Sequence, residues 1–405
     1  DVIASITAFM SRSIQIFMSM PPADLFLMLW PFLLLSIPRY LLTELVVLFQ
    51  AAMPESRAKV AFRRQLELQP PLVSVLLPGF NECETLETTV LALREQSYPN
   101  FEIIVVSDGS TDGMDAVGRR LAAKGWIRFF NHRMRGGKSS ASNFALQAAR
   151  GEYVVICDAD STFDSDSIWH LLVEFYRPKV FAVAGNLRVR NAPSNLLTRL
   201  QALQYILSIG VGRRASAMLG ILFIVSGAFG ALRRSPKAMC MTDAPDAWWT
   251  YYRQQLRWNR SMVRFQIRKY GWLFNPLRQK FSVRNLLPML DDVVFQLVLT
   301  VTIPFYLVWL HSEHQSIFWP LMFFVTLLYT AINYLHYLVA LALSERPKLE
   351  LALFPYVPLY GFFMGFYLRT VRLLAYLDEF FFRTSYREPY VPPDVQKQSR
   401  IYDPW

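Results

Sequence analysis

Two aspartates separated by one residue, Asp158 and Asp160, directly follow the apolar run at residues 153–157. Alternate residues of a strand share one face, so these carboxylates would repel each other unless a cation lies between them. A hard divalent cation, Mg²⁺ or Mn²⁺, would neutralise the pair, and diphosphate oxygens would complete its coordination shell. The alternative is a pair of solvated loop acids. We favour a metal site with Asp158 and Asp160 as ligands.

Two other strand ends carry polar residues that suit a nucleotide. Asp108 follows the apolar residues 103–106, where a carboxylate can hydrogen-bond a base or ribose as in dinucleotide-binding folds, although Asp and Gly also form ordinary turns. The string at residues 78–82 is either a turn with a helix cap or a nucleotide-binding edge, and both interpretations stay open. Its candidate substrate-binding residues are Pro78, Phe80, Asn81 and Glu82.

Gly136 and Gly137 precede Lys138 at the start of a predicted helix. A glycine pair lets backbone amides approach a phosphate, and the lysine adds a positive charge. The string is not a Walker loop, because the spacing of the glycines and the lysine differs. We therefore expect Lys138 to bind substrate phosphate.

Gln254, Arg257 and Trp258 lie together on a predicted amphipathic helix at residues 250–271. Alone, they suit a snorkelling arginine and an interfacial tryptophan. A catalytic role would give Trp258 a flat face on which a sugar ring stacks. Arg257 would then neutralise a leaving diphosphate, because its guanidinium can grip two phosphate oxygens.

The residues between these groups predict an α/β domain. Apolar runs at 73–78, 102–106, 126–130, 153–157 and 180–185 alternate with helical patterns at 84–95, 114–124, 139–149 and 167–176. Such alternation predicts a mostly parallel sheet covered on both faces. Ligands bind such sheets beyond the carboxyl ends of the strands, where both acidic strings lie.

Composition indicates a membrane protein with one soluble domain. The chain has 405 residues, of which 53% are hydrophobic and 18% charged, with a mean hydropathy of +0.23. Its formal charge of +11 suits anionic lipid headgroups and a nucleotide diphosphate. We expect no nucleic acid, because the basic residues flank apolar helices instead of forming one exposed stripe. The three cysteines form no Cys-x-x-Cys pair, which argues against a zinc site or a disulfide framework.

The apolar segments predict several membrane helices. Residues 2–18 either span the membrane or lie in its interface, and 25–48, 286–310 and 317–343 are predicted spans. Basic residues after 48 indicate that this end faces the cytosol, whereas the loop 311–315 lacks Lys and Arg, as an outside loop should. Residues 351–376 are a third C-terminal candidate that is either broken or lines a channel. The side of the C-terminal tail stays open, because the number of spans argues for outside and Arg383 and Arg387 argue for inside.

Together, these short sequence motifs resemble those of one protein family. In order and spacing, the chain is similar to membrane-embedded, processive family 2 glycosyltransferases: hyaluronan, chitin-oligosaccharide, poly-N-acetylglucosamine and bacterial β-glucan or cellulose synthases. The resemblance covers roughly residues 72–271 and the flanking spans. It implies that Asp108 contacts uridine and that Asp158 and Asp160 hold the metal and diphosphate. It also implies that Ser226 and Gly227 lie in the loop under the acceptor sugar, and that Gln254, Arg257 and Trp258 form the Gln-x-x-Arg-Trp motif beside the acceptor.

The resemblance further implies an α/β GT-A-like cytosolic domain inserted between transmembrane helices, with amphipathic interface helices. The expected parts are transmembrane or interfacial helices at 1–52, the GT-A domain at 53–249 with an interface helix at 195–219, an interface helix at 250–282, a transmembrane channel at 283–380 and a tail at 381–405. The implied enzyme elongates a β-linked polysaccharide from a UDP-sugar, of the UDP-glucose or UDP-N-acetylglucosamine type, and translocates it across the membrane.

The implied partners are the UDP-sugar donor, the growing polysaccharide, the lipid bilayer, and an accessory export subunit or a second copy of the chain. The implied location is the plasma membrane, the inner membrane in bacteria, with several spans and a cytosolic catalytic domain. Transfer of one sugar to a lipid-phosphate carrier is a second hypothesis, and a catalytically inactive scaffold is a third.

One departure concerns the general base. The family carries an acidic segment with the catalytic Asp between the acceptor loop and the string at residues 242–245, whereas this sequence has no Asp or Glu from Gly230 to Thr242. Either the chain lacks the base, or a segment is absent between Ala238 and Met239. We favour the second interpretation and assign neither Asp243 nor Asp246 as the base.

Overall fold

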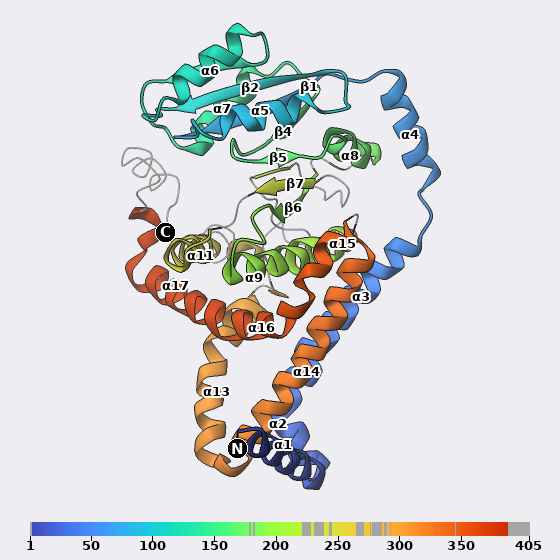
Figure 1. The fold of residues 1–405 in the computed structure, drawn as a ribbon, viewed down its shortest axis with the longest axis vertical. Coiled ribbons are helices and arrows are strands. Elements are labelled where there is room, and N and C mark those ends of the chain that lie inside the picture. The colour runs from blue at the N-terminus through green and yellow to red at the C-terminus, as the bar shows by residue number, and fades with distance from the viewer. Residues whose placement is uncertain are drawn as a thin grey trace.

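The fold is described from a computed structural model. It describes residues 2–177, 180, 183–220, 228–230, 239–242, 245–264, 271–275, 277, 286, 290–291, 293–344 and 346–387. An α/β part lies at one end of the molecule, a stem of long helices at the other, and a layer of crosswise helices between them (Figure 1).

The predicted parallel sheet is confirmed. Within the described residues it has four strands in the order β3-β2-β1-β4, with β1 at Val73–Gly79, β2 at Phe101–Asp108, β3 at Arg128–His132 and β4 at Tyr153–Ile156. Every residue of β1 is buried, as expected for a strand that helices cover on both faces.

Helices cover both faces of this sheet. Val75 and Leu77 of β1 face the side of α5 (Leu86–Arg94) and α6 (Met114–Ala123), whereas Leu76 faces Ala141 of α7 (Lys138–Ala148). This alternation follows the two-residue period of the strand. The domain continues with α8 (Ser167–Val173) and a 3₁₀ turn at Glu174–Tyr176. A further helix, α4 (Arg57–Leu68), was not predicted, and its Lys59 pairs with Glu174 at 2.7 Å.

A second, small sheet lies below the first. Its strands are β5 (Thr162–Phe163), β7 (Met239–Thr242) and β6 (Asn186–Val189), in the order β5-β7-β6. The strand predicted at 180–185 is therefore misplaced: β6 forms at Asn186–Val189, where β7 offers a parallel hydrogen-bonding partner. Ala184 makes an isolated bridge to Gly230, and residues 181–182 lie outside the described part.

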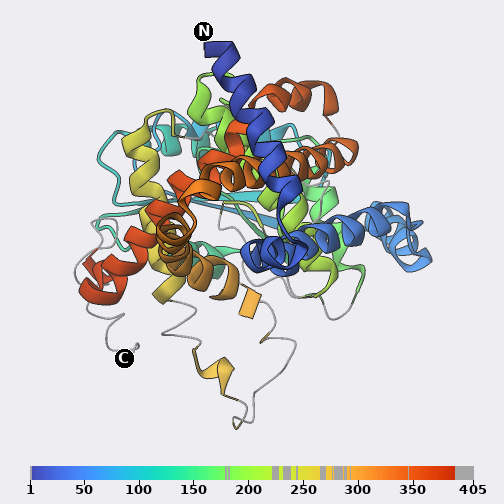
Figure 2. The same ribbon diagram turned by 90° about the horizontal axis from the view of Figure 1, so that it is seen from below.

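The crosswise layer contains both predicted amphipathic regions. It is made of α9 (Leu196–Gln204), a π-helical stretch at Tyr205–Gly212, α10 (Arg213–Met218), α11 (Trp248–Val263), α16 (Val357–Phe362), a π-helical stretch at Phe363–Leu368, and α17 (Arg369–Phe382). These helices lie across the long axis of the molecule (Figures 1 and 2). Most side chains of α9 are buried, and α9 packs against β6, α16 and the 3₁₀ turn at Leu351–Tyr356, so it connects the α/β part with the rest of the crosswise layer.

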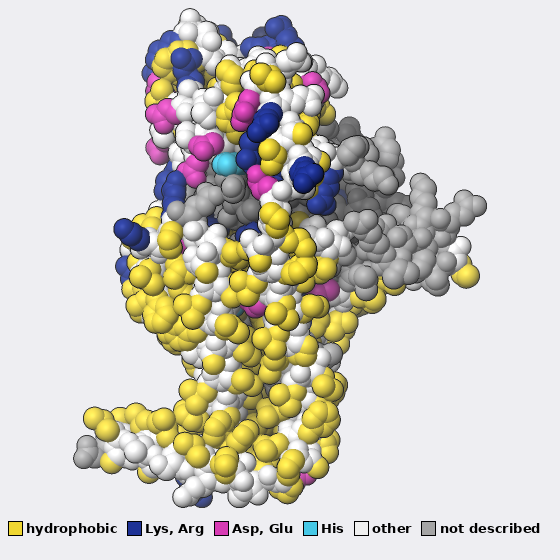
Figure 3. All heavy atoms as spheres, turned by 90° about the vertical axis from the view of Figure 1, so that its right-hand side faces the viewer, with side chains coloured by type: hydrophobic (Ala, Val, Ile, Leu, Met, Phe, Trp, Pro, Cys, Tyr) yellow, Lys and Arg dark blue, Asp and Glu magenta, His cyan; other side chains and the backbone are white. Residues whose placement is uncertain are grey.

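The stem is formed by long apolar helices. They are α2 (Pro22–Pro31), a π-helical stretch at Phe32–Ser36, α3 (Ile37–Ala52), a π-helical stretch at Val293–Val298, α13 (Leu299–Glu313) and α14 (Gln315–Ala342). α1 (Val2–Ser19) lies across the far end of the stem. On the face shown in Figure 3, hydrophobic side chains cover the stem, whereas charged side chains gather on the α/β part. Short turns complete the chain at Gly271–Phe274, Pro347–Glu350 (α15), Leu351–Tyr356 and Thr384–Arg387.

Four of the described helical segments are long and apolar enough to cross a membrane: Val2–Ser19, Val293–Glu313, Gln315–Ala342 and Pro347–Phe382. The outside loop predicted at 311–315 is nearly absent, because α13 reaches Glu313 and α14 begins at Gln315. Only His314 separates the two helices, and its backbone N–H donates to the carbonyl of Leu310. The predicted spans at 286–310 and 317–343 correspond to α13 and α14, although most of residues 281–292 lie outside the described part.

Candidate active site

The two predicted metal ligands lie where β4 ends. The Asp158 backbone N–H donates to the carbonyl of Ala228 at 3.1 Å, which holds the strand end beside the loop at residues 228–230. The Asp158 carboxylate forms an ion pair with the Nζ of Lys138, the first residue of α7. The structure therefore brings Lys138 to the acidic pair, whereas the sequence predicted only that Lys138 binds a substrate phosphate.

The charged form of Asp160 is disfavoured. Burial and the neighbouring Asp158 carboxylate raise its pKa, and they outweigh the hydrogen bond from Ser161 (3.1 Å). The Glu82 carboxylate, three residues after β1, interacts with the same two aspartates. Burial raises its pKa, and the charges of Asp160 and Asp158 raise it further. Lys138 supplies one positive charge against these three carboxylates. Asp158 and Asp160 can supply two oxygen ligands to a divalent cation, and the described residues contain no group of three or more Asp, Glu, His or Cys side chains arranged to hold one.

Asp108 holds the loop that carries Lys138. Its side chain is buried, and its two oxygens accept hydrogen bonds from the backbone N–H groups of Gly136 (2.8 Å) and Gly137 (2.7 Å). The next residue, Gly109, has φ +71°, and a Cβ there would lie 2.7 Å from the backbone nitrogen of Arg135. The glycine amides thus bind Asp108, and they do not point to a phosphate as the sequence suggested.

The loops after β1 and β2 brace each other. Asn81, at φ 57°, accepts a hydrogen bond from the Thr111 N–H at 2.8 Å and donates its own N–H to Ser110 at 3.0 Å. A Cβ at Gly79, after Pro78, would lie 2.5 Å from the terminal methyl group of Met114, so that flexible side chain would have to move. These contacts fix the string 78–82 as a rigid turn between two strand ends.

Two arginines that sequence analysis did not single out also belong to this region. The Arg135 guanidinium lies 3.8 Å from the centroid of the Phe80 ring, in cation–π contact. Arg190 donates to the Asp160 backbone carbonyl at 3.3 Å. Arg135 directly precedes the glycine pair, and this position was the signal that could have found it.

Gln254, Arg257 and Trp258 all lie on α11. This helix buries Tyr251, Gln255 and Asn259, and the four-residue spacing places them on one face. Trp258, three residues after Gln255, lies beside that face and is 42% exposed. The Gln254 Oε1 is buried without a hydrogen-bond partner among the described residues.

The small sheet connects these residues to the acidic pair. β5 begins two residues after Asp160 and pairs with β7, in which Met241 lies opposite Thr162. α11 begins shortly after β7 ends. Ser226 and Gly227 lie outside the described residues. Next to them, Phe229 is buried and forms a bridge with Cys157, directly before Asp158.

Comparison with known proteins identifies the domain. Residues 74–237 match the family model "Glycosyl transferase family 2". The chain carries a family 2 glycosyltransferase domain. It is 32% identical over 164 residues to the poly-beta-1,6-N-acetyl-D-glucosamine synthase of Staphylococcus epidermidis, and 31% identical to that of Staphylococcus aureus. Each match covers 40% of this chain and 40% of the relative's length.

The fold of the glycosyltransferase domain and its flanking helices has a solved counterpart. The mannosyltransferase PcManGT of Pyrobaculum calidifontis, solved in complex with GDP-Man and Mn²⁺, matches with a TM-score of 0.53 and 17% identity. The match covers 84% of this chain and 99% of the mannosyltransferase. At this identity the likeness supports the fold alone, and it confirms the predicted α/β, GT-A-like class.

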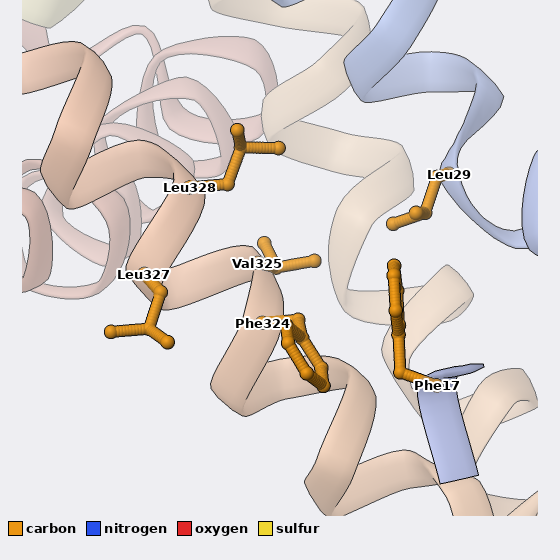
Figure 4. Close-up of a pocket in the computed structure, with 6 residues that line it drawn as sticks. All are labelled: Phe17, Leu29, Phe324, Val325, Leu327 and Leu328. Carbon is orange, nitrogen blue, oxygen red and sulfur yellow. The ribbon is translucent and has the colours of Figure 1, made fainter. Parts of the chain in front are cut away.

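The pocket between α1, α2 and α14 is distinct from the glycosyltransferase site. It has a volume of about 370 Å³, and Phe17, Leu29, Phe324, Val325, Leu327 and Leu328 line it (Figure 4). Its lining is entirely apolar and lies in the stem, so it lacks the groups that a nucleotide or sugar needs.

Asp108 gives a first prediction. Asp108→Ala removes the acceptor of two backbone N–H groups, and each unpaired group costs about 1–3 kcal/mol. We expect a lower unfolding temperature and weaker donor binding, because the loop that presents Lys138 loses its anchor. Thermal unfolding and donor titration in detergent measure the two effects. Asp166→Ala, at an exposed aspartate, is the control; equal behaviour of the two variants would contradict this role.

Glu82 gives a prediction about pH. Its pKa is raised above 4.5, so its protonated form is favoured in the folded protein. Relative to the unfolded chain, protonated Glu82 stabilises the folded protein at low pH. This stabilisation is lost as the pH rises through the raised pKa of Glu82. In metal-free protein, Glu82→Gln should therefore raise the unfolding temperature at pH 7, and the gain should vanish near about pH 4.

Thermal unfolding with a chelator, at both pH values, measures this gain. Glutamine still accepts the hydrogen bond from Thr85, which is 2.8 Å from Glu82, so the variant changes charge with little change of shape. The exposed Glu84→Gln is the matched control. Added Mn²⁺ should shrink the gain, because the cation compensates the charge of wild-type Glu82. A gain that persists unchanged at low pH would show that charge is not its cause.

Proposed function

We propose that this chain is a processive, inverting glycosyltransferase that elongates a β-linked polysaccharide from a UDP-sugar and translocates the product across the membrane. The observation that carries the proposal is the cluster of Asp158, Asp160, Glu82 and Lys138 at the strand ends of a family 2 glycosyltransferase domain. The matched relatives are named as synthases of a poly-N-acetylglucosamine, which supports a donor of the UDP-N-acetylglucosamine type, and a donor of the UDP-glucose type is the other candidate.

The donor end would bind the nucleotide diphosphate. Asp158 and Asp160 would hold Mg²⁺ or Mn²⁺, and diphosphate oxygens and water would supply the remaining ligands. The bound cation would stabilise the charge that builds on departing UDP. Lys138 would move from Asp158 to a diphosphate oxygen once the cation balances that carboxylate. Asp108 would fix the Lys138 loop and contact uridine beside the turn at residues 78–82.

The acceptor end would lie on α11. Trp258 has an exposed ring on which the terminal sugar can stack, and Gln254 has a buried amide oxygen that is free to accept a hydrogen bond from a sugar hydroxyl. Arg257 would grip the leaving diphosphate. Ser226 and Gly227 would form the loop under the acceptor. The acceptor hydroxyl then attacks the anomeric carbon, and the bond to UDP breaks on the opposite side.

A general base must take the proton of that hydroxyl, which contributes about 10²–10⁴-fold in rate. No Asp or Glu occurs from Gly230 to Thr242. Asp243 lies outside the described residues. Asp246 is exposed, and its backbone carbonyl accepts a hydrogen bond from Asn195 at 2.9 Å. This missing acid is the specific observation that favours the alternative of a catalytically inactive scaffold. Transfer of one sugar to a lipid-phosphate carrier is the other alternative, because it needs the donor residues alone.

The membrane arrangement completes the proposal. The glycosyltransferase domain would face the cytosol of a plasma membrane, which is the inner membrane in a bacterium. The functional divisions would be helices at 1–52, the domain at 53–249, the acceptor helix region at 250–282, a channel region at 283–380 and a tail at 381–405. An accessory export subunit or a second copy of the chain would receive the product.

Purified protein incubated with separate radiolabelled UDP-sugars and Mg²⁺ or Mn²⁺ tests the function. A polymer sized on a gel supports processive synthesis, and its loss with a chelator supports the metal. A single labelled sugar on a lipid supports the carrier alternative. If no donor releases UDP, the result supports the hypothesis of a catalytically inactive scaffold.

A further inference from the structure

The apolar segment Pro347–Phe382 has the length and composition of a membrane span. A span of the hydrocarbon core covers about 30 Å, so its two ends must lie on opposite sides of the membrane. The contacts of its two ends can therefore test whether it crosses.

The first end binds the glycosyltransferase domain. Glu350 pairs with Arg188 of β6 at 2.7 Å, and both side chains are largely buried. Just before the segment, Arg346 forms an ion pair with Asp164. These pairs place the end of α14 on the side of the catalytic domain.

The last turns of the segment also bind the catalytic side. Asp378 of α17 forms an ion pair with Arg260, and Arg372 donates to Asn259 at 3.3 Å. Both partners belong to α11, which follows the small sheet of the glycosyltransferase domain and is tied to α9 by the hydrogen bond from Tyr251 to Gln204 at 2.8 Å. The two ends of the segment thus have partners on one side of the molecule.

The path between the two ends is not straight. The segment begins with α15 and a 3₁₀ turn at Leu351–Tyr356, and α16 and α17 then run across the axis of α14 (Figures 1 and 2). The Tyr356 hydroxyl accepts a hydrogen bond from Arg199 of α9, which fixes the bend against the crosswise layer. This path returns to the catalytic side without reaching the far end of the stem.

The crosswise helices have one apolar exposed face. It is made of Phe362, Phe366, Leu374, Leu377, Phe380 and Phe381, with exposed fractions from 44% to 71%. On the opposite face, Val371, Ala375 and Glu379 are buried. Such a division is typical of a helix that lies in the plane of a membrane interface. The stem next to it is also apolar, so the lipid that surrounds the stem can continue over this face (Figure 3).

After α17 the chain reverses its direction in a turn that polar side chains hold. Arg383 has a left-handed backbone at φ 51°, and the buried Glu379 carboxylate accepts hydrogen bonds from the N–H (2.8 Å) and hydroxyl (2.9 Å) of Ser385. The chain therefore turns back toward α11 directly after the three phenylalanines at 380–382, and it does not continue into lipid.

We infer that residues 347–382 do not cross the membrane and that α16 and α17 form an interfacial anchor whose apolar face binds the bilayer surface on the catalytic side. Residues 383–387 then lie on the same side as the glycosyltransferase domain. Of the other described segments that are long and apolar enough to cross a membrane, Val293–Glu313 and Gln315–Ala342 follow one another at His314, so this pair returns the chain to the catalytic side.

Single-cysteine labelling tests the topology. In a variant with its three native cysteines replaced by alanine, Thr384→Cys, Arg133→Cys and His314→Cys report the segment end, the catalytic domain and the α13–α14 turn. A membrane-impermeant maleimide is applied to sealed vesicles of each orientation. We expect Thr384→Cys to label with the polarity of Arg133→Cys; labelling with the polarity of His314→Cys would overturn the inference.

If the cysteine-free protein does not fold, a protease cleavage site inserted after Arg387 of the wild-type chain gives the same information. Cleavage should occur in the vesicles in which the catalytic domain is accessible. Cleavage in vesicles of the opposite orientation would refute the inference.

A depth measurement then tests the lipid contact. Spin labels at Phe366, Leu374 and Phe381 report their depth through the ratio of oxygen to nickel-complex accessibility. An interfacial helix predicts similar, shallow depths at the three positions. Depths that pass through the bilayer centre would indicate a span, and a lack of oxygen contact would indicate that protein covers this face.

Discussion

Replacement of Asp160 by asparagine is expected to abolish sugar transfer. The variant loses one of the two carboxylates proposed to bind the metal, while its shape and its hydrogen bond from Ser161 (3.1 Å) remain. Even residues outside the first coordination shell of a metal contribute about 10–100-fold, so loss of a ligand should exceed about 100-fold. Release of UDP and formation of polymer, measured over a range of Mn²⁺ concentrations, quantify the loss.

The unfolding temperature separates loss of the site from loss of the fold. Burial and Asp158 disfavour the charged form of Asp160, so Asp160→Asn should not lower the stability of metal-free protein. Asp166→Asn removes an exposed charge on the same domain and should retain full activity. Normal polymer yield from Asp160→Asn would refute the metal site, whereas inactivity with a large drop in unfolding temperature would only indicate misfolding.

Replacement of Trp258 by alanine is expected to abolish polymer synthesis while slow hydrolysis of the donor continues. The ring is 42% exposed, so its removal should cost little stability but should remove the platform for the terminal sugar. Aromatic stacking contributes about 0.5–1.5 kcal/mol beyond buried area, and together with misplacement of the acceptor we expect elongation to fall by more than about 10-fold.

Product length on a gel, together with UDP release, measures the two activities of each variant. Trp258→Phe should restore part of the polymer length, because it keeps a flat ring. Trp249→Ala, which removes a 64% exposed ring on the same helix, is the matched control. Full-length polymer from Trp258→Ala would exclude an acceptor role and favour the interpretation of an interfacial anchor.

The alternating strands and helices of the glycosyltransferase domain could be predicted because each has a clear local period. The predicted strand at 153–157 and helix at 139–149 correspond to β4 and α7 within one residue at each end. The small sheet could not be predicted in the same way. β5 is two residues long and pairs with residues almost eighty positions later in the chain, so no local pattern marks it.

The candidate site was predicted in its residue types but only partly in its contacts. Lys138 was selected as a phosphate ligand, and its ion pair with Asp158 was not predicted. Asp108, however, is a buried anchor for Gly136 and Gly137, and nothing in the sequence near Asp108 indicates a hydrogen bond to residues 28 positions away. Similarly, composition cannot distinguish a span from an interfacial helix at 347–382, because the decision depends on where Asp378 and Glu350 find their partners.

The positions of the strands along the chain predict that the two sheets of the glycosyltransferase domain close at different times during synthesis. All four strands of the parallel sheet lie between residues 73 and 156, so this sheet can fold as soon as that stretch has left the ribosome. The three-stranded sheet must wait for β7 at Met239–Thr242, the middle strand between β5 and β6. Its pairing closes a long loop and should be the slower event in folding. The nascent chain would therefore hold a finished nucleotide half before the helix that carries Trp258 exists.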